Sequence, residues 1–109
     1  MHVADISMNL PSAQRGPNRW SYAIATVTIV DAGGKPVEGA TVSGHWSGAT
    51  GDSDSGVTDA DGKVSLQSDK VRNAASGTTF TFTVDDVALS GWTYNSTLNV
   101  ETSDSIIVP

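Results

Sequence analysis

The sequence predicts an all-β protein, an antiparallel sandwich of two packed sheets. Apolar and polar residues alternate with a period of two in several segments, which is the pattern of a strand with one buried face. Turn-forming clusters of Gly, Asp, Asn and Pro recur roughly every ten residues, as they do between short strands. Charged residues make up only 17% of the 109 residues, and this composition favours strands and turns over helices.

The first third of the chain contains two candidate strands. Residues 2–10 alternate, and their mainly apolar face would be formed by His2, Ala4, Ile6, Met8 and Leu10. Residues 11–18 are expected to break this strand. Residues 20–30 are long and rich in β-branched side chains, which predicts a central strand whose inner face includes Ala23, Ala25, Val27 and Ile29. Residues 31–36 form a turn, because glycine accepts positive φ and proline cannot donate to a ladder.

The middle of the chain predicts a two-faced strand, a loop and a hairpin. Residues 40–47 have an inner face formed by Ala40, Val42, Gly44 and Trp46. We expect Trp46 to be buried, because a tryptophan on such a strand commonly packs in a sandwich core. Residues 48–56 are a polar loop, and residues 57–66 contain an Asp/Gly turn that predicts a tight hairpin.

The last third begins with the most regular strand of the sequence. Residues 78–84 place Phe80, Phe82 and Val84 inward, and Val87 and Leu89 continue the strand past two aspartates. Residues 91–99 are expected to form a loop or an irregular strand, and residues 105–108 the final strand. Together with Leu66 in the hairpin, these strands form one core. Seven or eight short strands at this spacing predict an immunoglobulin-like antiparallel β-sandwich.

Five motifs occur in order along the chain: residues 25–31 (Ala-Thr-Val-Thr-Ile-Val-Asp), 34–37 (Gly-Lys-Pro-Val), 39–42 (Gly-Ala-Thr-Val), 58–64 (Thr-Asp to Gly-Lys-Val) and 79–84 (Thr-Phe-Thr-Phe-Thr-Val). The order resembles that of bacterial immunoglobulin-like accessory domains, close to the carboxypeptidase-regulatory-like group. Residues 1–3, 43–48 and 91–100 are also similar to modules near the C-termini of secreted bacterial peptidases and polysaccharide-degrading enzymes. This resemblance implies a non-catalytic domain of a larger exported protein, and it specifies a fold rather than a ligand.

Composition and charge exclude several partners. The net charge is −6 with six basic residues, so we expect no nucleic-acid binding, which depends on neutralising phosphates. The chain has no cysteine and therefore no disulfide. Apolar runs are too short to span a bilayer, and residues 1–5 lack the features of a signal peptide. We therefore expect one monomeric domain, residues 1–109, excised from a longer secreted protein.

The sequence offers weak candidates for catalysis and metal binding. His45 shares the outer face of its strand with Ser43 and Ser47, but no nucleophile elbow is present and no acidic residue is placed by sequence to orient the imidazole. The carboxylates of Asp52, Asp54, Asp59 and Asp61 do not follow EF-hand spacing, and turn hydrogen bonds account for those of residues 59 and 61. We therefore expect no enzymatic activity, no metal and no cofactor.

The aromatic residues are the stronger candidates for binding. Trp92 and Tyr94 form one pair spaced by two residues, and Trp20 and Tyr22 form another. Members of such a pair share a face of a strand. They either pack in the core or form a platform on which a sugar ring stacks.

These observations predict a non-catalytic extracellular accessory domain that spaces, stabilises or docks a secreted bacterial hydrolase. Its partner would be the catalytic domain of the same parent chain. Two alternatives remain: a carbohydrate-binding module that uses the exposed aromatics to hold a polysaccharide, and a cell-surface adhesion repeat.

Overall fold

The computed structural model describes residues 1–109, except for the side chains of residues 13–15. One sheet has the order β1 (His2–Asn9), β4 (Ile24–Val30) and β7 (Lys63–Gln67). A second sheet has the order β10 (Ser103–Ile107), β9 (Thr79–Ala88), β5 (Thr41–Gly48) and β6 (Ser53–Val57). A small third sheet has the order β2 (Ser12–Arg15), β3 (Asn18–Ser21) and β8 (Val71–Arg72). The described backbone contains no α-helix, only the 3₁₀ turn η1 (Ser96–Leu98).

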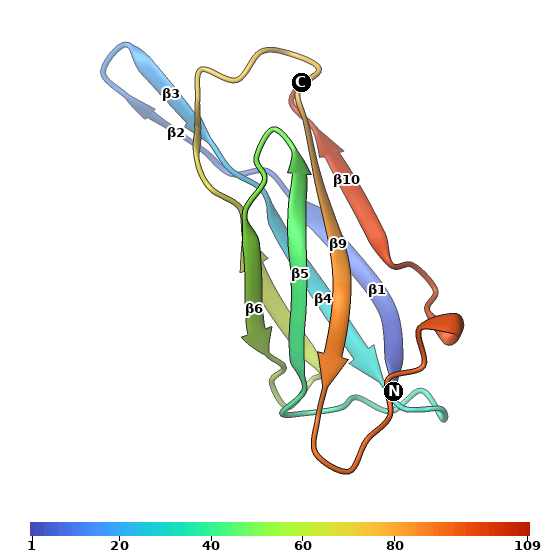
Figure 1. Ribbon diagram of the computed structural model, residues 1–109. Coiled ribbons are helices and arrows are strands. Elements are labelled where there is room, and N and C mark those ends of the chain that lie inside the picture. The colour runs from blue at the N-terminus through green and yellow to red at the C-terminus, as the bar shows by residue number, and fades with distance from the viewer.

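The two larger sheets lie face to face in a sandwich-like arrangement (Figure 1). Alternate residues of each strand point inward, so apolar side chains of both sheets fill the space between them. Eight residues that the alternation of their strands places in the core are buried: Val27, Ile29, Val42, Trp46, Leu66, Phe80, Phe82 and Val84. All strand pairings are antiparallel. The prediction of an all-β antiparallel protein is therefore confirmed.

Trp46 on β5 and Phe82 on β9 lie at the centre of the second sheet's inner face. The two residues are direct cross-strand partners, and their ring centroids are 4.9 Å apart. Gly44 lies two residues before Trp46 on the same face. A Cβ atom at Gly44 would overlap the Phe82 ring and the carbonyl oxygen of Thr83. Glycine is therefore required here to make room for the phenylalanine.

A β-bulge at Ala4 shifts the alternation of β1. Val3 pairs with Ile29, whereas Asp5 already pairs with Thr28, so one residue of β1 has no partner. As a result Val3 is fully buried and His2 and Ala4 are only half-buried. The predicted inner face is therefore wrong at His2 and Ala4, because simple alternation does not reveal an inserted residue.

A second bulge lies in β9 at Asp85. Ser43 pairs with Asp86 and Gly44 pairs with Val84, which leaves Asp85 without a partner on β5. The bulge turns Val87 inward, where it is buried, and the strand continues past the two aspartates as the sequence predicts. The strand continues to Ala88, and the final strand β10 begins at Ser103, two residues before its predicted start.

The predicted loop and hairpin in the middle of the chain are wrong. Residues 53–57 are not a loop but strand β6, which pairs with β5. The Asp/Gly turn then connects β6 to β7, which pairs with β4 in the opposite sheet. The turn thus joins two sheets instead of closing a hairpin. Gly62 has φ +73° and its carbonyl oxygen accepts a hydrogen bond from Ile29 N (2.7 Å), which fixes the turn against β4.

The predicted break at residues 11–18 is also wrong in part. This segment contains β2, the turn and the start of β3, which pair with each other as a hairpin. The predicted central strand is consequently divided, because β3 belongs to the small sheet and β4 to the sandwich. The small sheet accounts for the strands in excess of the seven or eight expected. It projects beyond the sandwich at one end of the molecule (Figure 1).

Replacing Phe82 by Ala is expected to lower the free energy of unfolding by about 3 to 5 kcal/mol, because it removes a fully buried ring and leaves a cavity. The matched control is Val57→Ala, since Val57 is 59% exposed on the edge strand β6. This control should cost less than about 1 kcal/mol. Chemical denaturation of the three proteins measures both values. A Phe82→Ala loss as small as that of the control would show that the inner face is misassigned.

Candidate functional site

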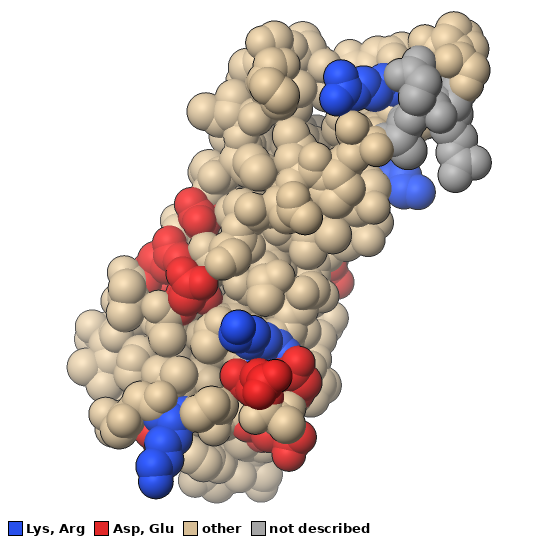
Figure 2. Space-filling view, turned by 180° about the vertical axis from the view of Figure 1, so that it is seen from behind, with Lys and Arg blue, Asp and Glu red and all other residues tan. Residues whose placement is uncertain are grey.

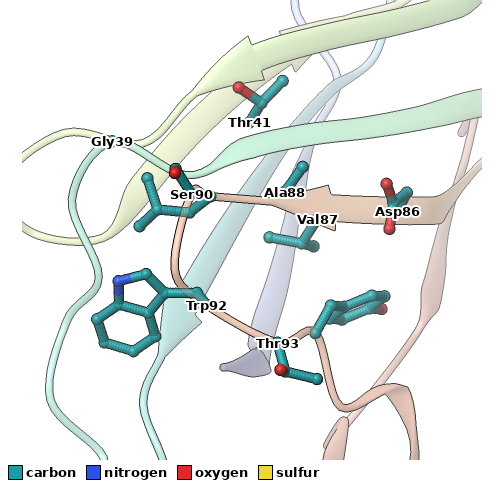
Figure 3. Close-up of a pocket in the computed structure, with 10 residues that line it drawn as sticks. Gly39, Thr41, Asp86, Val87, Ala88, Ser90, Trp92 and Thr93 are labelled. Atoms are coloured by element: carbon teal, nitrogen blue, oxygen red, sulfur yellow. The ribbon is translucent and has the colours of Figure 1, made fainter.

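An open groove of about 740 Å³ lies at the end of the sandwich opposite the small sheet (Figure 3). The end of β9 forms one wall, the start of β5 forms another, and residues 89–94 complete it. Its lining combines apolar groups with hydroxyl groups, including Val87, Leu89, Trp92, Tyr94, Thr41 and Ser90. The groove therefore offers both apolar surface and hydrogen-bonding groups to a ligand.

A tight turn after β9 positions Trp92 at the edge of this groove. Trp92 N donates a hydrogen bond to Leu89 O (2.9 Å), and Gly91 has φ +82°, as a type II turn requires at its third residue. Trp92 is 46% exposed and lines the groove together with Ser90 and Gly39 (Figure 3). Such an exposed ring presents an apolar face to solvent.

Tyr94 has a different environment from Trp92. It is half-buried and packs against the core, and its hydroxyl accepts a hydrogen bond from Asn99 Nδ2 (2.7 Å). Asn99 Oδ1 in turn accepts a hydrogen bond from Val3 N (2.7 Å), so this amide fastens the loop to β1. Tyr94 therefore supports the groove, whereas Trp92 is the ring presented at its edge.

Glu101 fastens the end of the same loop to β1. Its Oε1 accepts a hydrogen bond from Ile6 N (2.5 Å). Burial raises the pKa of Glu101 above its ordinary value, and the nearby carboxylates of Asp104 and Asp5 act in the same direction, while the hydrogen bond from Ile6 opposes them. The ionised form of Glu101 is thus less favourable in the folded protein than in the unfolded chain.

Trp20 and Tyr22 do not join Trp92 and Tyr94 in one site. They belong to β3 and the residue after it, at the end of the molecule opposite the loop that follows β9 (Figure 1). Lys70 Nζ lies 5.7 Å from the centroid of the Tyr22 ring and covers one of its faces. Trp20 is half-buried and pairs across the strands with Arg72. The four aromatic candidates therefore form two separate environments.

The structure places an acidic partner beside His45 that the sequence did not reveal. His45 Nδ1 lies 2.9 Å from both carboxylate oxygens of Asp85. The side chains are 44% and 52% exposed, respectively. Asp85 is the bulged residue of β9, and no sequence signal gives the pairing of β5 with β9 at this register. The described side chains make no hydrogen bond between His45 and a serine, so the contact is a surface hydrogen bond between His45 and Asp85 without an attached nucleophile.

Two carboxylates of the aspartate cluster, those of Asp54 and Asp59, accept hydrogen bonds from backbone N–H groups. Asp59 Oδ1 accepts hydrogen bonds from Asp61 N (2.9 Å) and Lys63 N (3.1 Å), which confirms its predicted turn role. Asp54 accepts hydrogen bonds from Ser55 N and from Gln67 N on β7. Within the part of the chain whose side chains are described, no group of three or more His, Asp or Glu side chains is placed to hold a metal ion.

Comparison of the chain with protein-family models, with curated proteins and with solved structures finds no match. Among the described residues, no helix is both long enough and apolar enough to cross a membrane. The functional argument therefore rests on the geometry of the chain itself.

Glu101→Gln is expected to stabilise the protein at neutral pH. Because the folded-state pKa of Glu101 is raised, its contribution to stability is present below the unfolded-state pKa and is lost as pH rises through the folded-state pKa. Glutamine keeps the acceptor for Ile6 N and removes the charge. Near pH 3, below the ordinary glutamate pKa of about 4.3, the two proteins should unfold alike.

Denaturant unfolding at the two pH values measures this difference. Glu38→Gln is the control, because it makes the same change of charge at an exposed glutamate of another segment. Equal effects of the two substitutions at neutral pH would contradict the assignment to Glu101.

Proposed function

We propose that the chain is a non-catalytic, immunoglobulin-like accessory domain of a secreted bacterial hydrolase. The observation that carries the proposal is the strand order of the two larger sheets. In immunoglobulin-type sandwiches the second strand pairs with the first and the fifth, while the third, sixth and seventh form the facing sheet. Here β4 pairs with β1 and β7, and β9 pairs with β5 and β10. Strand β6 extends the second sheet, as the extra strand of variable-type domains does.

The shape of the domain supports a spacing role. Its principal-axis extents are 50 × 23 × 19 Å. The two termini lie at opposite ends of the long axis (Figure 1). Domains joined to the two termini would therefore be held apart along that axis. An acidic surface rich in Ser and Thr fits an extracellular location, and the catalytic domain of the parent chain is the proposed partner.

The isolated domain is expected to show no turnover of peptide, ester or polysaccharide substrates, because a surface His45–Asp85 pair without a nucleophile cannot perform covalent catalysis. Assays with each substrate class measure this directly, and His45→Ala is the diagnostic variant. Turnover by the purified domain that disappears in His45→Ala would overturn the non-catalytic assignment. Turnover that persists in this variant would indicate a contaminating enzyme, and repurification would remove it.

A second candidate function is carbohydrate binding at the groove beside Trp92. The specific observation in its favour is a tryptophan 46% exposed on the rim of a groove that also presents hydroxyl groups. An indole face stacks on the apolar face of a sugar ring, while serine and threonine hydroxyls bond to the sugar hydroxyls. Tyr94 would support the rim through its contact with Asn99.

Trp92→Ala is expected to release the domain from an insoluble neutral polysaccharide without changing its melting temperature appreciably. The physical reason is that an exposed ring contributes little to folding and much to stacking. Tyr94→Phe is the companion variant, since it keeps the packed ring and removes the hydroxyl that Asn99 contacts. A large fall in the melting temperature of Trp92→Ala, or no retention of the unaltered domain by any polysaccharide tested, would assign Trp92 to packing.

A further inference from the structure

The charges of the protein are separated between two parts of the molecule. We define the arm as residues 12–22 and 69–73, which contain β2, β3 and β8. The arm contains four of the six basic residues and one of the twelve acidic residues. In Figure 2 the end of the molecule that carries the arm shows blue side chains and no red ones, whereas red side chains lie on the rest of the visible face together with some blue ones. The arm is therefore a cationic surface on an acidic protein.

Three of the four cations of the arm have no carboxylate partner among the described side chains. Among the described side chains, no carboxylate lies within 4.0 Å of Arg19, Lys70 or Arg72, and all three residues are exposed. Arg19 Nη2 donates one hydrogen bond to Ser12 Oγ (3.2 Å). A guanidinium has five N–H donors, so most donors of Arg19 remain available to a carboxylate or sulfate.

Asn73 ties the backbone of Arg19 to the segment that carries Arg72. Its N donates to Arg19 O (2.6 Å), and its Oδ1 accepts from Arg19 N (2.9 Å). Asn73 adopts φ +51°, a left-handed conformation that asparagine tolerates better than most residues. Its side chain also donates to Asn18 Oδ1 (3.1 Å). These bonds tie the β2–β3 hairpin to the segment of β8, although the two are more than fifty residues apart in sequence.

A groove of about 320 Å³ lies between the arm and the end of β10. Its lining includes Arg19, Asn9, Ser12 and Ser21 together with the apolar Leu10 and Ile106. The volume is at the lower end of the roughly 300 to 1,000 Å³ range of small-molecule sites. This lining matches a sugar ring that bears a carboxylate. The cation can pair with the carboxylate, the hydroxyl and amide groups can bond to the sugar hydroxyls, and the apolar wall can contact the ring.

The opposite face of β3 also presents a cation, here next to an aromatic ring. Trp20 and Arg72 are direct cross-strand partners, so their side chains emerge next to each other on one face. Arg19 precedes Trp20 in β3 and therefore emerges on the other face. An indole beside a guanidinium combines a stacking surface for a sugar ring with a bidentate partner for its acidic group.

We propose that the arm is a binding site for an acidic polysaccharide, with Arg19 and Arg72 pairing with its carboxylates. The site is independent of the groove beside Trp92 and does not rest on it. The acidic body does not prevent binding, because charges are screened over about 10 Å at 0.1 M salt and the molecule extends over 50 Å. Nucleic acid fits less well, since so few cations release few counterions. A second copy of the chain fits less well because each copy has a net charge of −6.

The experiment measures the affinity of the domain for polygalacturonate by calorimetry, at low and at high salt. The test variant replaces both Arg19 and Arg72 by Gln, which removes two charges and keeps long polar side chains. The matched control replaces Lys35 and Lys63 by Gln, since both are exposed on the body and the change in net charge is identical. We expect the Kd to rise by at least about tenfold in the test variant and by less than about twofold in the control.

Three comparisons decide the outcome. Equal loss of affinity in the two double variants would overturn the proposal, because net charge alone would then explain binding. Binding of a single-stranded oligonucleotide or of a neutral galactan as tight as that of polygalacturonate would also overturn it. If the double variant unfolds, Arg72→Gln alone is used, because Arg72 is exposed and lies on the short edge strand β8. The affinity of Trp20→Ala for polygalacturonate is measured as well. If both Arg72→Gln and Trp20→Ala keep the affinity of the unaltered domain, the assignment of the Trp20–Arg72 face is overturned.

Discussion

The contact between the Phe82 ring and Gly44 is the constraint on which the second sheet depends. No other residue fits at position 44, because a Cβ atom would overlap both the ring and the backbone of β9. The contact fixes Trp46 opposite Phe82 and Gly44 opposite Val84. The remaining residues of β9 must then accommodate one extra residue, Asp85. The bulge turns this aspartate to the outer face, where it meets His45.

Much of the core could be predicted because alternation reports which face of a strand is apolar. Phe80, Phe82 and Trp46 were located in this way. Alternation does not show which strands pair with each other. It therefore predicts a hairpin around the turn at residues 59–62, whereas this turn joins the two sheets. Alternation also does not reveal an inserted residue, and for this reason the predicted inner face of β1 is wrong at His2 and Ala4, before and at the bulge. Both errors concern pairing between strands, which depends on contacts distant in sequence.

The candidate site shows the same division between local and long-range information. The spacing of Trp92 and Tyr94 predicts only that the two side chains share a face, whereas the structure shows that Trp92 is 46% exposed and that Tyr94 is half-buried. The different role of Tyr94 depends on Asn99 and on Val3, which lies at the other end of the chain. Local reasoning did not reveal the cationic arm, since Trp20 and Arg72 become neighbours only when β3 pairs with β8. Net charge alone suggested an acidic surface throughout and concealed this asymmetry.

The two candidate binding surfaces and the core use different residues, and this separation has a functional consequence. Trp92 projects from a turn fixed by Gly91, and Arg72 projects from a short edge strand, so neither side chain belongs to the buried core of the sandwich. Changes at such distant sites combine almost additively in their effects on stability. Either surface can therefore change its ligand without altering the packing of Trp46 and Phe82. In the proposed spacer role, separable surfaces at the two ends would allow the domain to hold a polymer at one end while a neighbouring domain acts at the other.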